Sequence, residues 1–180
     1  AYDSLNRLIR ETDQQSAQIN LTRDGRDNVT TYSDPRSLST SYIRNGFGEV
    51  KRQSSPDSGN TDYVRDLRGL VTQKTDGRLV VTNMTYDNAG RMLTKTYPAA
   101  ATENVTYTYD AFVAGTNFGK GRLTSLVHEG GSIARTYDAR GNITSDVRTI
   151  TGAGAKTIAY LYSAADLTIA QAAALAGIVQ

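Results

Sequence analysis

An internal repeat of 21 residues restricts the fold more than any other feature of the sequence. The pattern Tyr-Asp-x-x-Gly/Asn-Arg/Asn-apolar is clearest at residues 2–8, 86–93 and 137–144, and weaker copies begin with Arg, as at Arg23, Arg44 and Arg65. The first five copies are spaced by 21 residues, and the later intervals are 23, 28 and 25. A fixed period of this length is typical of architectures in which similar units stack on their neighbours. We therefore expect residues 1–165 to form an array of about eight units.

Each copy carries the residues that a β-hairpin turn requires. Asp or Asn opens a type I turn because its side chain accepts a hydrogen bond from the backbone two residues on. Three positions later, Gly, Asn or Asp tolerates the left-handed conformation that ends the loop. The expected turn-opening residues are Asp3, Asp24, Asn45, Asp66, Asp87, Asp110, Asp138 and Ser163, and the left-handed positions are Asn6, Asp27, Gly48, Gly69, Gly90, Gly141 and Asp166.

The segments between these turns have the alternation of β-strands. Eleven Tyr and three Phe, with no Trp, favour an all-β chain over a helical bundle. Tyrosines two residues apart should project from one face of a strand and stack across strands. We expect an extended, twisted antiparallel sheet of tandem hairpins. Its unpaired edge strands would favour association with other chains. The repeat aromatics are Tyr2, Tyr42, Tyr63, Tyr86, Tyr107, Tyr109, Tyr137, Tyr160 and Tyr162.

Two segments depart from the repeat. After Asp110, residues 111–121 replace a four-residue turn, and this longer loop, with Phe112 and Phe118, is the best candidate for a binding loop. Residues 166–180 are rich in Ala and contain no Tyr. Helix propensity favours a short C-terminal helix there. The alternative keeps this tail in the array as a degenerate repeat.

The Tyr-Asp-x-x-Gly-Arg pattern resembles the YD repeat of Rhs proteins, of the C components of insecticidal toxin complexes, of wall-associated bacterial proteins and of teneurins. The resemblance covers residues 1–165. In this family the repeats spiral into a hollow shell, which in bacterial members encloses a toxic C-terminal segment of the same chain. The resemblance implies that this chain is a portion of shell wall, bacterial in origin and secreted or exposed on the cell surface. Its partners would be the rest of the parent shell and the enclosed segment.

The sequence departs from this family in two respects. About eight units are too few to close a shell, and the chain, which starts within a repeat at Ala1, is interpreted as a fragment of a longer protein. The family's self-cleaving motif, similar to Asp-Pro-x-Gly-Leu, is also missing. The closest match begins at Asp34-Pro35 but lacks the Gly, and we interpret it as an Asp-Pro turn.

Composition argues against several other functions. The formal charge of +2 is spread along the chain, which does not favour nucleic-acid binding, and no apolar stretch is long enough for a membrane span. Without Cys, and with His128 as the only histidine, no metal site or other cofactor site is expected. The recurring Asp residues are better explained as turn caps than as calcium ligands. No catalytic constellation is present, so we do not expect an enzyme.

Two functions remain open at this stage. The first is a structural segment of a toxin-enclosing shell. The second is a surface module that binds glycans or proteins, because Tyr and Arg on an exposed sheet suit sugar stacking as well as cross-strand packing. A solvent-facing aromatic cluster between Phe112 and Phe118 would favour the second.

Overall fold

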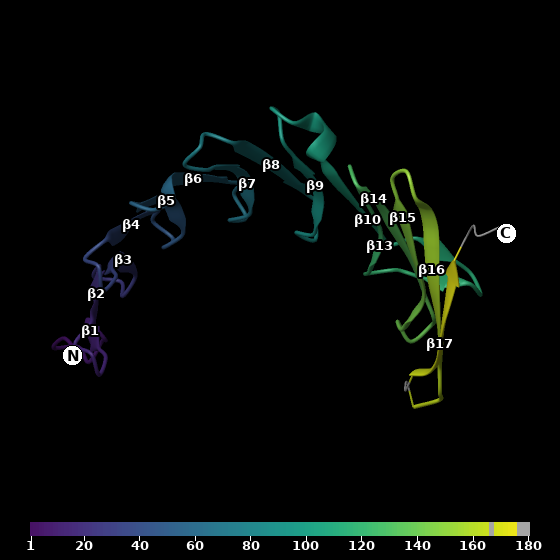
Figure 1. Ribbon diagram of the computed structural model, residues 1–180, viewed down its shortest axis with the longest axis horizontal. Coiled ribbons are helices and arrows are strands. Elements are labelled where there is room, and N and C mark those ends of the chain that lie inside the picture. The colour runs from purple at the N-terminus through teal and green to yellow at the C-terminus, as the bar shows by residue number, and fades with distance from the viewer. Residues whose placement is uncertain (166–167, 176–180) are drawn as a thin grey trace. The chain divides into compact units, whose positions relative to one another are not determined.

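The computed structural model describes residues 1–165 and 168–175, and these residues form β-strands joined by short turns (Figure 1). One 3-10 helix, η1 (Ala101–Glu103), is the only helical element in these ranges. The expected all-β fold is therefore confirmed. The chain divides into two compact units, Ala1–Asn83 and Met84–Gln180, each with its own antiparallel pairing.

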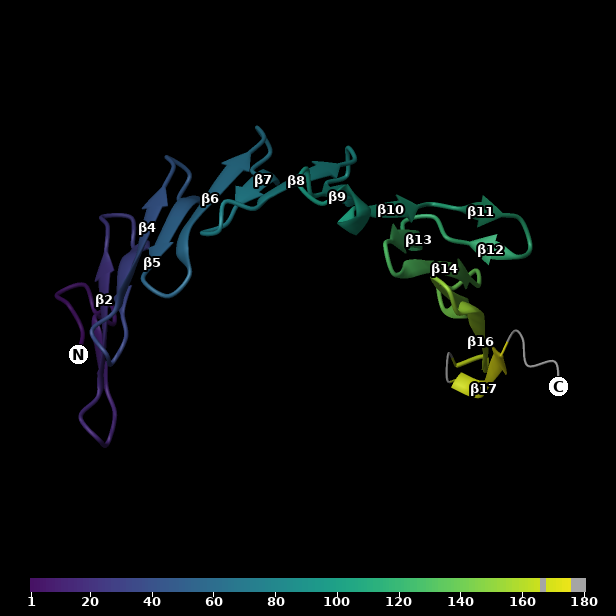
Figure 2. The ribbon, with the colours of Figure 1, turned by 45° about the horizontal axis from the view of Figure 1, so that its top comes forward.

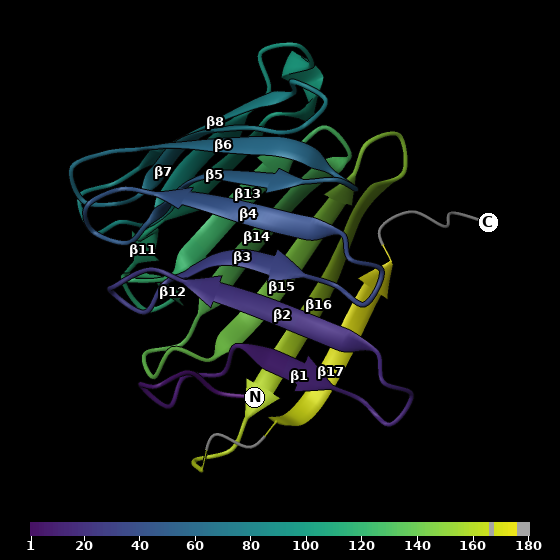
Figure 3. The same ribbon diagram turned by 90° about the vertical axis from the view of Figure 1, so that its left-hand side faces the viewer.

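In the first unit, every strand pairs antiparallel with the next one along the chain. Figure 3 shows this succession most clearly from β2 to β6. Strand β8 starts in this unit, where Val81 to Asn83 pair with β7. The strands are β1 (Arg10–Thr12), β2 (Gln18–Arg23), β3 (Val29–Ser33), β4 (Ser39–Arg44), β5 (Val50–Ser55), β6 (Gly59–Arg65), β7 (Val71–Thr75) and β8 (Val81–Tyr86).

The second unit is also an antiparallel meander, with one small hairpin inserted after β10. Figure 2 shows the hairpin, β11 and β12, extending beyond the ends of β10 and β13. The strands are β9 (Met92–Thr96), β10 (Val105–Tyr109), β11 (Phe112–Val113), β12 (Asn117–Phe118), β13 (Leu123–His128), β14 (Gly131–Tyr137), β15 (Ile143–Ile150), β16 (Gly154–Tyr162) and β17 (Thr168–Leu175).

Each 21-residue repeat contains two strands and two turns, and the two turns lie at opposite ends of the strands. Of the second set of turns, only the Asp-Pro turn at Asp34 was expected from the sequence, and it was not recognised as part of the repeat. Asp13, Asp34 and Asp76 open them with the same hydrogen bonds as the predicted turns, and the residue three positions later again has positive φ. These residues follow the same period, so the pattern Asp-x-x-Ser at Asp13 and Asp34 was the signal that could have revealed them.

The sheets bury very little apolar surface. Tyr137, at 6 % exposure, is the only hydrophobic side chain that is buried in the part of the chain that the structure describes. Thr61, Thr82, Asn117, Thr124 and Asp146 are the buried polar residues. Each sheet is one layer thick, so backbone ladders and paired polar side chains, rather than a hydrophobic core, hold neighbouring strands together.

The helix expected over residues 166–180 is wrong for the residues that can be compared. Thr168 to Leu175 form β17, which pairs with β16 from Lys156↔Leu175 to Tyr162↔Thr168. The edge of β16 presents unpaired backbone donors and acceptors, and this pairing outweighs the modest intrinsic helix preference of Ala. The alternative, in which the tail continues the array, therefore holds for residues 168–175. Residues 166–167 and 176–180 lie outside the described ranges, as does the expected left-handed residue Asp166.

Candidate functional site

The turns of the repeat have the geometry that the sequence predicts, and Asp87 illustrates it. Its backbone N–H donates to the Arg91 carbonyl at 3.0 Å, and its own carbonyl accepts the Gly90 N–H at 3.1 Å. Its carboxylate Oδ1 accepts the Arg91 N–H at 2.9 Å. That backbone hydrogen bond is the main reason why the pKa of Asp87 is lowered. The turn is thus fixed by residues within four positions of each other.

The left-handed position is equally regular. Its φ angles are 60° at Asn6, 68° at Asp27, 85° at Gly48, 83° at Gly69, 80° at Gly90 and 96° at Gly141. A β-bulge accompanies these turns, for example between Val64 and Arg65 and between Thr136 and Tyr137. The sequence predicted a residue that tolerates the left-handed conformation at these six positions, and each of them has positive φ, whereas the bulge was not predicted. The turns opened by Asp3, Asp24, Asn45, Asp66 and Asp138 share the hydrogen bonds of Asp87.

The tyrosine that precedes the turn links each unit to the one before it. The hydroxyl of Tyr109 donates to the Met92 carbonyl at 2.9 Å. Tyr137 donates to the Leu123 carbonyl at 2.6 Å, and Tyr162 donates to the Ile143 carbonyl at 2.9 Å. In each case the acceptor is the apolar residue that follows the turn of the preceding unit. We call this contact the reach-back bond.

In three repeats of the first compact unit, arginine takes the place of this tyrosine, and Arg23 and Arg44 make the same reach-back bond. The Arg44 Nη2 donates to the Val29 carbonyl at 3.2 Å, and the Arg23 Nε lies 3.4 Å from the Leu8 carbonyl. The guanidinium also donates to a carbonyl in its own turn, at 2.9 Å from Arg44 to Gly48. Arg23 and Arg44 are therefore structurally equivalent to the tyrosine of the other copies, which sequence comparison alone did not reveal.

The arginine that follows the turn glycine forms a clamp between neighbouring turns. Arg91 Nε donates to Asp87 at 2.6 Å, while Nη1 and Nη2 donate to both carboxylate oxygens of Asp110 at 3.0 and 2.6 Å. The same guanidinium lies 4.5 Å from the centroid of the Tyr109 ring. The Arg91 side chain, followed by the Gly121 backbone N–H, lowers the pKa of Asp110 to about 2. One motif arginine thus contacts Tyr and Asp of the next unit.

Further arginines connect the turn tips directly. Arg26 donates to the Gly46 carbonyl in the next turn, and Arg140 donates to the Ala164 carbonyl at 2.6 Å. Both arginines lie two residues after the turn-opening Asp, and both acceptors lie one residue after the next turn-opening residue. We call this contact the tip bond. The tip bond and the arginine clamp join consecutive turns. The repeats are therefore coupled along the side of the sheet where these turns lie.

The remaining predicted aromatics differ in their surroundings. Tyr160 and Tyr162 stack with centroids 6.5 Å apart, which confirms that they share one face, although they contact along β16 rather than across strands. Arg44 lies 5.7 Å from the Tyr42 ring centroid, and Tyr2 is 63 % exposed. Tyr63, Tyr86 and Tyr107 are half-buried.

The long loop after Asp110 is a small hairpin rather than an irregular loop. Phe112 and Phe118 pair across it, with ring centroids 5.7 Å apart in an edge-to-face arrangement. Phe112 is 47 % exposed, and the Lys120 ammonium lies 4.9 Å from its centroid. The base is held by Asn117, which is buried and whose side-chain oxygen accepts the Tyr137 N–H at 3.2 Å. Sequence inspection did not single out Asn117, which has no counterpart in the other units.

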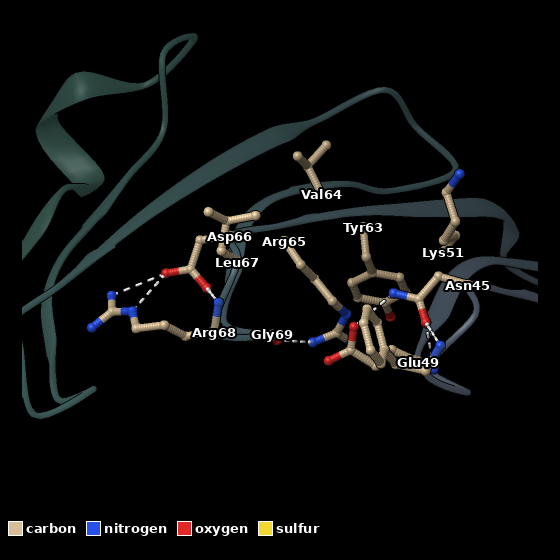
Figure 4. Close-up of a pocket in the computed structure, with 11 residues that line it drawn as sticks. Asn45, Glu49, Lys51, Tyr63, Val64, Arg65, Asp66, Leu67, Arg68 and Gly69 are labelled. Atoms are coloured by element: carbon tan, nitrogen blue, oxygen red, sulfur yellow. Dashed lines mark hydrogen bonds and ion pairs between the residues drawn. The ribbon is translucent and has the colours of Figure 1, made fainter.

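A pocket of about 680 Å³ opens between the turns of residues 45–49 and 66–69 (Figure 4). Phe47, Lys51, Tyr63 and Leu67 contribute to its wall. Two of these side chains are almost fully solvated, since Phe47 is 93 % exposed and Leu67 is 108 % exposed. The pocket combines aromatic faces with charged groups and is wide open to solvent.

Two other residues that the sequence analysis considered, His128 and Asp34, lie in turns. His128 is exposed at the end of β13, and its Nδ1 accepts the Gly130 N–H at 3.0 Å, as expected of a turn residue. Asp34 accepts the backbone N–H groups of Arg36 and Leu38, as the Asp-Pro turn interpretation requires. No group of three His, Cys, Asp or Glu side chains suited to a metal ion occurs within residues 1–165 and 168–175. Over the same ranges, no helix has the length and apolar character needed to cross a bilayer.

The fold is similar to that of solved toxin complexes. The crystal structure of TcdB2-TccC3-Cdc42 matches 96% of this chain with 14% identity and a TM-score of 0.76. That of TcdB2-TccC3 matches 96% with 12% identity and a TM-score of 0.78. The structure of the Photorhabdus luminescens Tc holotoxin pore matches 87% with 12% identity and a TM-score of 0.67.

These matches concern a small part of much larger proteins. The chain spans 10%, 11% and 9% of the three matched chains, respectively. At such low identity the likeness shows the fold alone. No family model matches the sequence, and no curated protein matches it significantly.

Proposed function

We propose that this chain is a structural wall segment of a longer Rhs-type YD-repeat protein, in which the repeats form a shell around a toxic C-terminal segment. The observation that carries the proposal is the coupling of consecutive units. The reach-back bond of Tyr109 to Met92 and the clamp of Arg91 on Asp110 join two consecutive repeats without a hydrophobic core, and further reach-back bonds join other neighbouring repeats. Such units can be added one after another, as a wall requires.

The similarity to Tc complexes supports a structural role of this kind. The match extends over 96% of the chain, so it involves the array and not one hairpin. A wall one layer thick needs partners on its edges, and we propose that these are further repeats of the parent protein. The proposed setting is a secreted or surface-exposed bacterial protein, and the proposal assigns no catalysis to the chain.

Protease protection of the parent protein tests the proposal. The full-length parent and a variant that lacks these repeats would be digested under native conditions, and the lifetime of the segment downstream of residue 180 would be measured. We expect the downstream segment to survive in the parent and to be degraded in the deletion variant. Equal digestion of that segment in both proteins would exclude a containment role.

A point variant makes the test sharper, because a large deletion could disturb the parent in other ways. Replacing Arg91 and Tyr109 together by Ala removes the clamp and one reach-back bond, and it should increase cleavage within or behind the wall. Tyr2→Ala is the matched control, since this ring is 63 % exposed. A double variant that protects the downstream segment as well as the control does would contradict the proposed role of the clamp.

The hairpin after Asp110 supports a second candidate function, the binding of a cell-surface glycan or protein. Phe112 and Val113 are 47 % and 58 % exposed, and a lysine lies beside the Phe112 ring. Replacing residues 111–121 by a four-residue turn of the Asp87 type would separate the two functions. A wall segment would keep its protective effect, whereas a recognition module would lose its binding to cells.

A further inference from the structure

The pocket between the turns of residues 45–49 and 66–69 lies where the contacts between neighbouring turns are interrupted. Phe47 occupies the position from which Arg26 and Arg140 make the tip bond. Glu49 occupies the position from which Arg91 clamps the next turn. Each of the other predicted four-residue turns that begin with Asp carries arginine at one of these two positions, whereas this turn has an aromatic ring and a carboxylate and no arginine at either. The two turns therefore leave open the space that an arginine side chain occupies elsewhere.

The reach-back bond is also missing at this interval. Arg65 is the residue that corresponds to Arg44, and its Nη1 donates to the Gly69 carbonyl at 2.7 Å. Its Nε, however, is buried and has no hydrogen-bond partner. A buried donor without a partner costs about 1–3 kcal/mol, so this arrangement is unfavourable for the array alone. The sequence changes at this interval are thus not explained by better contact between the two turns.

Apolar surface and one free cation meet in the pocket. In the pairing of β5 with β6, Arg52 lies opposite Asp62. Lys51 and Tyr63 are the next residues along these two strands, so the side chains of Arg52 and Asp62 project from one face of the sheet and those of Lys51 and Tyr63 from the other. Both side chains line the pocket, and Lys51 makes no ion pair with the residues that the structure describes. Phe47 presents a ring that is 93 % exposed. The pocket thus offers two aromatic rings and an unpaired ammonium group.

The carboxylates around the pocket are already engaged, as Figure 4 shows. Glu49 Oε2 accepts the Asn45 side-chain amide at 2.7 Å. The Asp66 carboxylate accepts the backbone N–H groups of Arg68 and Leu70 and pairs with the Arg68 guanidinium at 3.0 Å. The wall carries three cationic side chains, Lys51, Arg65 and Arg68, against the two carboxylates of Glu49 and Asp66, so the pocket is better suited to an anion than to a cation.

We propose that this pocket binds the ring of an acidic sugar, that is, a pyranose that carries a carboxylate. The C–H face of such a ring is apolar and matches the exposed faces of Phe47 and Tyr63, which are amphipathic and rigid. Its carboxylate would pair with the Lys51 ammonium through a charge-assisted hydrogen bond. The site is separate from the wall contacts and from the Phe112 hairpin, so it can exist whether or not the chain encloses a toxic segment.

Ligand-observed NMR with this chain tests the proposal. The probes would be glucuronic acid and N-acetylneuraminic acid, with glucose and N-acetylglucosamine as neutral counterparts. We expect saturation transfer to the acidic sugars and affinities at least about tenfold weaker for the neutral ones, as the loss of one charge-assisted hydrogen bond implies. Equal binding of acidic and neutral sugars, or no binding of either, would overturn the proposal.

Two pairs of variants locate the site. Phe47→Ala and Lys51→Gln should each weaken binding of the acidic sugars by about tenfold or more. Leu5→Ala, which changes the same position in another turn, and Lys156→Gln, which removes an exposed cation from β16, should leave binding unchanged. The thermal midpoint of each variant shows that the fold is retained. Unchanged binding in Phe47→Ala, or binding of an acidic peptide in preference to the sugars, would contradict the assignment.

Discussion

The Arg91 guanidinium lies 4.5 Å from the centroid of the Tyr109 ring, so the arginine of one repeat packs on the tyrosine of the next. The Tyr109 hydroxyl in turn donates to the carbonyl of Met92, the neighbour of that arginine. The three conspicuous residues of the motif, Tyr, Asp and Arg, are therefore parts of one contact that crosses from unit to unit. Four predictions follow from this contact and from the turn geometry.

The pKa of Asp110 should depend on Arg91. In the intact protein the arginine lowers this pKa from 3.8 to about 2. A lowered pKa means that the ionised carboxylate stabilises the fold above pH 3.8 and that this contribution is lost as the pH falls toward 2. In Arg91→Met we expect the pKa of Asp110 to rise toward its usual value, although the Gly121 N–H still donates to the carboxylate at 2.6 Å.

A carboxyl-carbon NMR titration measures this change directly. Asp62 is the internal control, because its pKa is lowered by Arg52 and not by Arg91. The Arg91→Met substitution should leave the Asp62 titration unchanged. An Asp110 titration curve that is identical in both proteins would show that the clamp does not form in solution.

The reach-back bond should contribute measurably to stability at Tyr137. This side chain is 6 % exposed and its hydroxyl donates to the Leu123 carbonyl at 2.6 Å. Tyr137→Phe removes the donor and keeps the ring, so we expect a loss of about 0.5–1.5 kcal/mol in the free energy of unfolding. Tyr2→Phe is the control, since Tyr2 is 63 % exposed, and it should have almost no effect in the same urea titration. Equal effects would mean that the reach-back bond does not stabilise the array.

Arg65→Tyr should be tolerated and should stabilise the chain. Either Tyr or Arg occupies this position in the repeats, and the Arg65 Nε is buried without a hydrogen-bond partner. Removing that unsatisfied donor should raise the free energy of unfolding by about 1 kcal/mol. Arg44→Tyr is the matched substitution at a position where the reach-back bond is made, and it should give a smaller gain or none. Destabilisation by Arg65→Tyr alone would contradict the equivalence of the two residues.

Leu79→Asn should also stabilise the chain. Leu79 has a φ of 64° and is 80 % exposed, and it stands where the other turns carry Gly, Asn, Asp or Ser. A left-handed conformation costs about 1–2 kcal/mol for a residue such as Leu, and Asn adopts it more readily. We expect a higher thermal midpoint for Leu79→Asn. Gly90→Ala, at a φ of 80°, makes the reverse change and should lower the midpoint.

The sequence predicted the turns better than it predicted the C-terminal tail. The turn residues from Asp3 to Gly141 were identified because their hydrogen bonds join positions at most four residues apart. In the second set, the turn at Asp34 was recognised as an Asp-Pro turn, but its place in a periodic set with Asp13 and Asp76 was missed, because these copies lack the Tyr or Arg that precedes the predicted turns. The tail was predicted as a helix, and for residues 168–175 the prediction was wrong because the edge of β16 competes with local propensity.

The amino-acid sequence by itself determined where this chain turns. An Asp or Asn followed three residues later by a residue that tolerates positive φ closes a hairpin through contacts within the turn, whatever lies around it. Only the tertiary structure decided which side chains and backbone groups of consecutive repeats contact each other. The bond from Tyr109 to Met92, the exchange of Tyr for Arg, and the open pocket beside Phe47 all depend on strand register and on the distance between consecutive turns. Those quantities are set by the pairing of whole strands with their neighbours, and a pattern that covers a single turn does not contain them.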